Sequence, residues 1–154
     1  MIISTQNGEL VVFGKKRLFT RMQEYTNVVQ MAIFRALIFE EPSLNTDRGK
    51  RIAACAANLM VGRDSPDGDS SEQHEARELA ARILRRNTDI RFASAQCLRT
   101  TATIQGTQTP FFDNMKAIEW IAQFGDLPME APNPDSMHEL ACRLGTRYGV
   151  LESQ

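Results

Sequence analysis

Two short segments place a histidine directly before a glutamate, the pair that opens the helical motif of zinc peptidases. In that motif two imidazoles one helical turn apart bind zinc, and the glutamate serves as a base. The pairs at 74–75 and 138–139 begin correctly, but Glu78 and Cys142 stand where the second histidine is required. Because the chain has only two histidines, we predict no metal site and no cofactor.

The three cysteines, Cys55, Cys97 and Cys142, raise the question of a thiol nucleophile or a structural zinc. They lack the C-x-x-C spacing of a zinc knuckle, and no local signature pairs any of them with a histidine. Cys55 and Cys97 fall on apolar helix faces, where a free cysteine is usually a core residue. A small, odd number of cysteines is typical of reduced thiols in a cytosol. We therefore expect a cytoplasmic protein that is not an enzyme.

The distribution of charge is the sequence feature that departs most from an ordinary pattern, because basic and acidic residues are segregated along the chain. Residues 77–99 contain six arginines against two acidic residues, whereas residues 113–139 contain six acidic residues against one lysine. These segments either face each other within the fold or across a dimer, or form two separate binding surfaces. The predicted partner-binding residues come from the basic segments: Lys15, Lys16, Arg77, Arg82, Arg85, Arg86 and Arg91.

The elements that would position these side chains begin with a β-hairpin predicted over residues 1–14. β-Favouring residues at 2–3 and 10–13 flank an Asn-Gly pair at 7–8, the strongest short signal for a hairpin turn. Two strands alone are marginal in water, so the hairpin has to pack on helices or gain another strand. The β-branched residues at 100–104 are either that strand or the end of a helix.

A long helix is predicted from about 16 to 41, and we expect it to be central. Apolar residues recur along it at helical spacing, and its second half is apolar nearly all round, a pattern typical of a helix covered on several sides. Arg35 lies within this apolar run. Since a buried charge needs a partner, we expect a carboxylate from another element beside it.

Capping residues and apolar stripes predict further helices down to the C-terminal region. Ser70 with Gln73 forms a capping-box pattern, Gly62 closes the preceding helix, and Pro110 stands at a favoured first helical position. The expected ranges are about 46–61, 70–86, 88–99 and 110–124, with a last helix from about 136. The predicted fold is a mostly α bundle of five to six helices around the 16–41 helix, with the N-terminal hairpin.

Bulk properties agree with one folded domain over residues 1–154. The chain is 42% hydrophobic and 24% charged, close to the average for globular proteins. Its net charge of −1 provides no large field to attract nucleic acid or a membrane surface. We find no signal-peptide pattern and no apolar run long enough to cross a bilayer, so no membrane contact is predicted.

Because the sequence contains no catalytic motif, it favours a protein that acts through protein–protein contacts. We expect this protein to be a homodimer. Small proteins of this kind include adaptors, chaperones and phage-encoded inhibitors of host defence. The alternative is a nucleic-acid-binding regulator that uses the arginine-rich segment. Aromatic residues are not interleaved with these arginines, so a platform that stacks single-stranded bases is not favoured.

Overall fold

The computed structural model describes residues 22–63, 68–105, 114–127 and 134–151. In these ranges the chain is helical, with no strand. The predicted hairpin, together with Lys15 and Lys16, lies outside the described residues. The elements are α1 (Met22–Glu40), the 3-10 turn η1 (Pro42–Leu44), α2 (Asp47–Val61), α3 (Ser70–Arg86), α4 (Thr88–Gln105), α5 (Asn114–Ala122) and α6 (Pro134–Arg147).

The ends of α2 and α3 follow from local capping chemistry. The Thr46 side chain accepts a hydrogen bond from the N–H of Gly49, and Gly62 ends α2 in the left-handed conformation that glycine favours. At the start of α3, Asp69 and Glu72 form a reciprocal capping box. The predicted box at Ser70 was therefore one residue too late, because Asp69 caps as well as serine does.

The segment 100–104 is helical, so the alternative of a third strand there is wrong. α4 runs through it to Gln105. Extending a helix that has already formed fixes one residue for each new hydrogen bond, whereas a strand needs a neighbouring strand with which to pair. No such strand lies in the described part of the chain.

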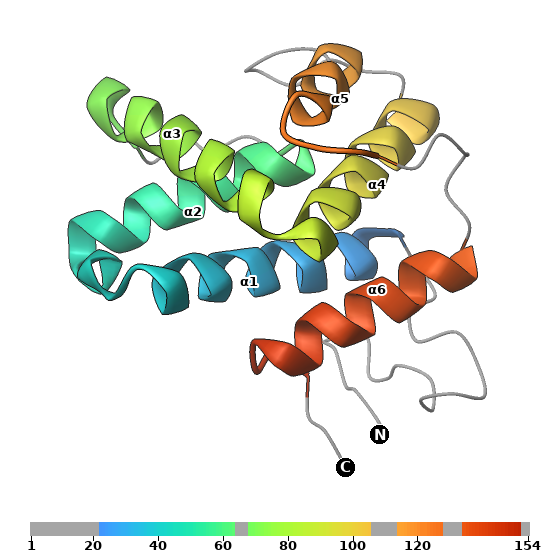
Figure 1. Cartoon of the computed structure of the whole chain (residues 1–154), viewed down its shortest axis with the longest axis horizontal. Helices are drawn as coiled ribbons and strands as arrows, with labels where there is room; N and C mark the ends of the chain where they lie inside the picture. Colours follow the sequence, from blue (N-terminus) through green and yellow to red (C-terminus); the bar gives the residue numbers. More distant parts are fainter. Residues whose placement is uncertain (1–21, 64–67, 106–113, 128–133, 152–154) are drawn as a thin grey trace.

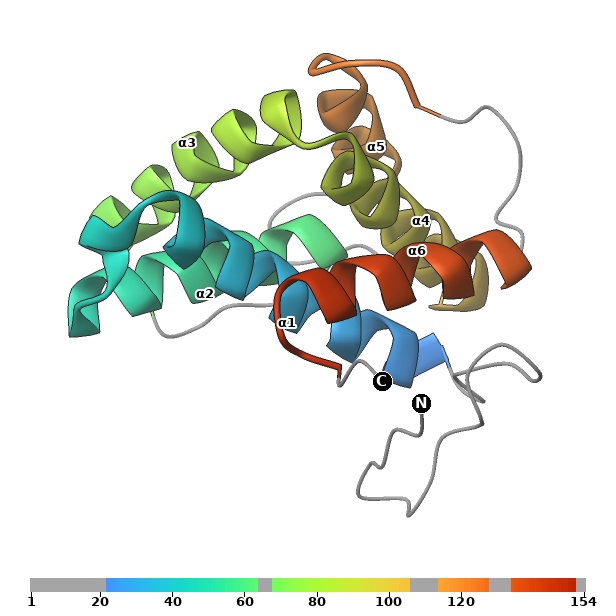
Figure 2. The same ribbon diagram turned by 60° about the horizontal axis from the view of Figure 1, so that its bottom comes forward.

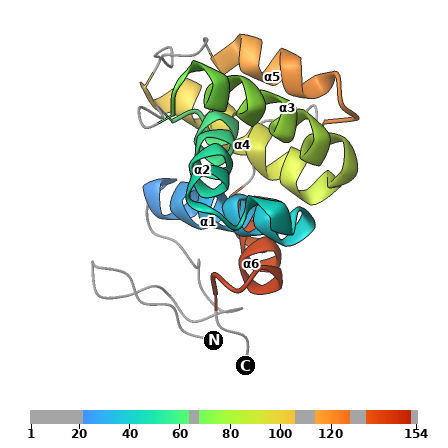
Figure 3. The same cartoon turned by 90° about the vertical axis from the view of Figure 1, so that its left-hand side faces the viewer.

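The helices are arranged with α1 between α2 on one side and α6 on the other (Figures 1 and 3). α3 packs against α2, and α5 packs against α4 (Figure 2). α4 contacts every other helix in the described part of the chain. The mostly helical bundle is thus confirmed, and within it both α1 and α4 contact several neighbouring helices.

All six helices contribute to one cluster of buried apolar side chains. α1 supplies Val29, Ala32, Ile33 and Ala36, each with 0% exposure. Burying such side chains away from water is the main favourable term in folding. None of the helices that the structure describes is both long enough and apolar enough to span a membrane.

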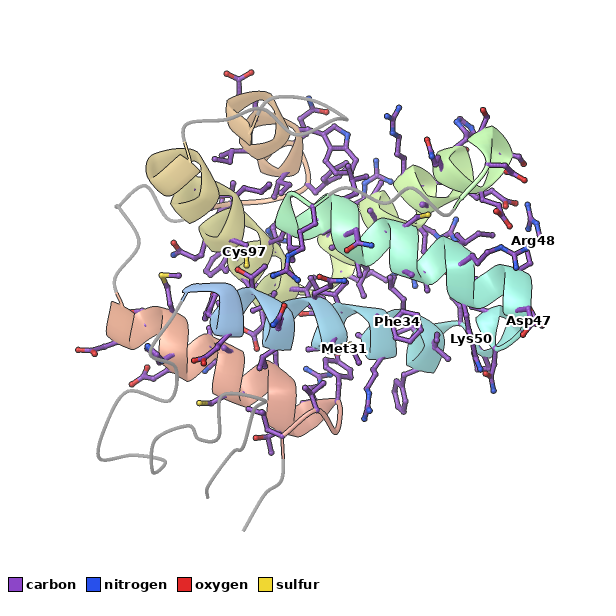
Figure 4. All side chains as sticks on the ribbon, turned by 180° about the vertical axis from the view of Figure 1, so that it is seen from behind. Met31, Phe34, Asp47, Arg48, Lys50 and Cys97 are labelled. Carbon is purple, nitrogen blue, oxygen red and sulfur yellow. The ribbon has the colours of Figure 1, made fainter. Side chains whose placement is uncertain are left out.

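The opposite side of α1 faces outward, and this changes the interpretation of Arg35. Met31 is 43% exposed and lies on this outer side (Figure 4), whereas Phe34 is half-buried against the core. Arg35 is also exposed, and its Nη1 donates a 2.7 Å hydrogen bond to the Gly149 carbonyl oxygen. No carboxylate of the described residues pairs with Arg35, and a guanidinium at the surface keeps its hydration and needs no buried counter-charge.

An ion-pair network joins the start of α2 to the start of α3. The Glu72 side chain, 5% exposed, pairs with Arg51 at 3.1 Å and with Arg48 at 3.8 Å. Its Oε1 also accepts the N–H of Asp69 at 3.2 Å. The hydrogen bonds from Arg51 and Asp69 hold the pKa of the Glu72 carboxyl below its ordinary value of 4.5, because they favour the charged form.

This network predicts an acid-sensitive contribution to stability. A carboxyl whose pKa is lowered on folding stabilises the folded state above its unfolded pKa, and this stabilisation is lost as the pH falls through the folded pKa. Glu72→Gln should therefore lower the free energy of unfolding near neutral pH but flatten its decline below about pH 5. Urea titrations at a series of pH values measure both effects. Glu119→Gln is the control, since this side chain is exposed and forms no ion pair with a described residue; an equal flattening in the control would contradict the assignment.

Candidate functional site

A single residue, Asn87, joins α3 to α4, and its side chain organises the corner between them. Oδ1 accepts a 3.0 Å hydrogen bond from the N–H of Ile90 and so caps α4. Nδ2 donates to the Tyr148 hydroxyl at 3.1 Å. Because Tyr148 directly follows α6, the α3–α4 corner is tied to the end of the last helix.

Arg91 holds the same corner from inside. Its side chain, predicted to bind a partner, is only 8% exposed and makes its hydrogen bonds within the fold. Nη1 donates to the Leu84 carbonyl oxygen at 2.9 Å, and Nε donates to the Asp126 carbonyl oxygen at 3.2 Å. Leu84 belongs to the last turn of α3, where free carbonyls and the negative end of the helix dipole favour a cation.

Gly125 is part of this arrangement, because the Arg91 guanidinium passes directly over it. A Cβ at position 125 would lie 2.5 Å from Arg91 Cζ, and the backbone φ of +154° is unfavourable for any residue with a side chain. Glycine in the turn after α5 therefore leaves the space that the Arg91 guanidinium occupies. The local sequence signal was a helix stop at Gly125, and its second role becomes evident only in three dimensions.

A pocket of about 360 Å³ opens where the end of α1, the α3–α4 corner and the end of α6 meet. These segments are distant in sequence, and Asn87 and Arg91 set the position of the α3–α4 corner. The lining includes an aromatic pair, two arginines and two carboxylates. Its residues are Phe39, Glu40, Arg86, Asn87, Thr88, Asp89, Arg147 and Tyr148.

Three lining side chains stand out by their exposure and pairing. Phe39 is 77% exposed, and among the described residues only Met31 is a further exposed large hydrophobic side chain. Arg86 is exposed in the last turn of α3 and forms no ion pair with a described residue. Arg147 lies with its Cζ 5.3 Å from the Tyr148 ring centroid. We call Phe39, Arg86, Arg147 and Tyr148 the pocket surface.

The remaining predicted arginines of α3 do not converge on this pocket. Arg82 forms an ion pair with Glu41, the residue that follows α1, at 3.1 Å. The Cζ of Arg85 lies 5.0 Å from the Phe124 ring centroid, a cation–π contact. Arg77 precedes Arg86 by nine residues and so projects from roughly the opposite side of α3. The arginine-rich segment is therefore divided among several contacts and does not form one cationic surface.

The cysteines fill space in the interior and are poor nucleophiles. All three are buried, which confirms the core assignment of Cys55 and Cys97. Cys97 lies where α4 crosses α1 (Figure 4). Burial raises the pKa of its thiol to about 12 and that of Cys142 to about 11, so little of either is present as thiolate at neutral pH. No three metal-ligating side chains gather within the described ranges, so the cysteines and His138 do not come together as a zinc site there.

The hydrogen bonds of Arg91 give a direct prediction for stability. Arg91→Met keeps most of the apolar stem but leaves the Leu84 and Asp126 carbonyl oxygens without their donor. We expect the free energy of unfolding to fall by about 2–4 kcal/mol in urea titrations. The control Arg77→Met, at an exposed position, should change it by no more than about 0.5 kcal/mol. Equal effects from the two substitutions would show that Arg91 does not hold the corner.

Comparisons with known proteins provide no template for this pocket. No family model matches the chain, and no curated protein or solved structure matches it either. What the pocket binds has to be inferred from the chemistry of the residues that line it.

Proposed function

We propose that the chain is a non-catalytic protein-interaction protein that binds another protein through the pocket surface. The observation that carries the proposal is Phe39, a large aromatic side chain left 77% exposed beside a pocket. Exposing an aromatic ring to water is unfavourable, and a partner that covers it recovers that free energy. Aromatic residues and arginine are enriched at the energetic centres of protein interfaces, and both border this pocket.

The positions of the arginines favour a protein partner over nucleic acid. Binding a phosphate backbone requires several free cations along one surface. Arg82, Arg85 and Arg91 are instead engaged in an ion pair, a cation–π contact and buried hydrogen bonds.

Within the proposal, the protein acts in the cytoplasm as a small adaptor, chaperone or inhibitor, and as a homodimer. Light scattering on the purified chain measures the oligomeric state.

The test is a pull-down with tagged chain from an extract of the native host, treated with nuclease and analysed by mass spectrometry. Phe39→Ala should reduce retention of the partner by at least 30-fold, the effect expected for an interface residue worth about 2 kcal/mol. Its free energy of unfolding should change by no more than about 0.5 kcal/mol, because the side chain is exposed. Met31→Ala is the matched control and should retain the partner.

Charge variants on α3 extend the same experiment. Arg86→Glu should weaken retention, whereas Arg77→Glu on the opposite side of the helix should not. Equal retention by wild type, Phe39→Ala and Arg86→Glu would contradict the proposal. Retention that depends on intact nucleic acid and falls steeply with salt would favour the nucleic-acid alternative instead.

A further inference from the structure

The charges around the pocket do not cancel, and their balance indicates the kind of group that fits. Four ionised side chains line it: Arg86, Arg147, Glu40 and Asp89. Asp89 pairs with Arg143 of α6, Oδ2 to Nε, at 3.1 Å, so its charge is largely offset. Two guanidiniums then face a single carboxylate, that of Glu40. Among the ionised side chains of the lining, one positive charge is left unmatched, which suits a ligand carrying one negative charge.

A dianion such as a phosphate monoester fits this balance less well. Its second charge would have no counter-charge in the pocket and would be repelled by Glu40. A carboxylate carries a single charge, and its two oxygens match the planar fork of a guanidinium. Arg86 is suited to this contact, because it forms no ion pair with a described residue.

The apolar residues that line the pocket set a second requirement for its ligand. Two aromatic residues, Phe39 and Tyr148, line the pocket together with the arginines. A ligand that only neutralised charge would leave Phe39 exposed. A volume of about 360 Å³ is near the lower end of the range for small-ligand pockets, so it admits a short segment and not a folded element.

We propose that the pocket binds a short peptide segment of the partner in which one carboxylate lies next to an apolar side chain. The carboxylate contacts Arg86 and Arg147, and the apolar side chain covers Phe39. This assignment rests on the proposed function and deepens it, since it specifies the chemistry of the partner. The carboxylate comes either from an acidic side chain or from the C-terminus of the partner.

The experiment is a selection of short random peptides, flanked on both sides by carrier sequence, on the full chain. Wild type should enrich peptides with aspartate or glutamate next to a large apolar residue. Arg86→Glu should lose this preference and enrich lysine or arginine at the same place. Arg77→Glu, the matched control on α3, should select the same peptides as wild type. Selection without acidic enrichment, or identical selection by wild type and Arg86→Glu, would overturn the proposal.

Synthetic versions of a selected peptide identify the source of the carboxylate. One version keeps the acidic side chain and has an amidated C-terminus, and the other has a neutral amide side chain and a free C-terminus. Binding of either version supports the proposal and identifies the source, and failure of both overturns it. Neutralising both carboxylates should weaken binding roughly 10- to 100-fold, as expected for a hydrogen-bonded charge. Tighter binding of a phosphorylated version would overturn the single-charge assignment.

The outcomes separate this proposal from the proposed function. If Phe39→Ala and Arg86→Glu lose the partner in the pull-down but the selection shows no acidic preference, the surface is correct and the carboxylate assignment is wrong. If neither variant loses the partner, the proposed function itself is wrong.

Discussion

The buried guanidinium of Arg91 is the interaction on which the arrangement of the second half of the molecule depends. Removing a cation from water is costly unless hydrogen bonds replace its hydration, and Arg91 obtains them from the Leu84 and Asp126 carbonyl oxygens. One side chain thereby fastens the end of α3, the start of α4 and the turn after α5. The corner that carries Arg86 is consequently held in place from within, and Asn87 ties it to Tyr148.

Most of the helical framework could be predicted because its signals are local. Thr46 and Gly62 mark the ends of α2 through hydrogen bonds made within a few residues. Apolar periodicity identified the buried faces of α1 to α4 for the same reason. The extension of α4 beyond residue 99 was ambiguous, because a β-branched run differs from good helix formers by well under 1 kcal/mol per residue. Such a small preference is outweighed by extension of a helix that has already formed.

The candidate site was far less predictable, because it exists only where distant segments meet. Arg86 was identified from charge alone, but Arg91 was grouped with it although one is exposed and the other buried. The sequence does not reveal the angle at a one-residue corner, and that angle decides which arginine faces inward. Phe39 ends an apolar run whose pattern predicts coverage on several sides, and nothing in that run marks it as exposed. Arg147 and Tyr148 enter the pocket through the packing of α6 on α1, which no local pattern encodes.

Photo-crosslinking from the position of Phe39 measures whether the pocket surface contacts a partner protein. A photoreactive benzoylphenylalanine replaces Phe39 in cells of the native host, with the same replacement at Met31 as control. If the partner binds there, position 39 should give a discrete crosslinked adduct that disappears when Arg86→Glu is added and is missing from position 31. An adduct of equal yield from both positions, or one that persists with Arg86→Glu, would contradict the proposal.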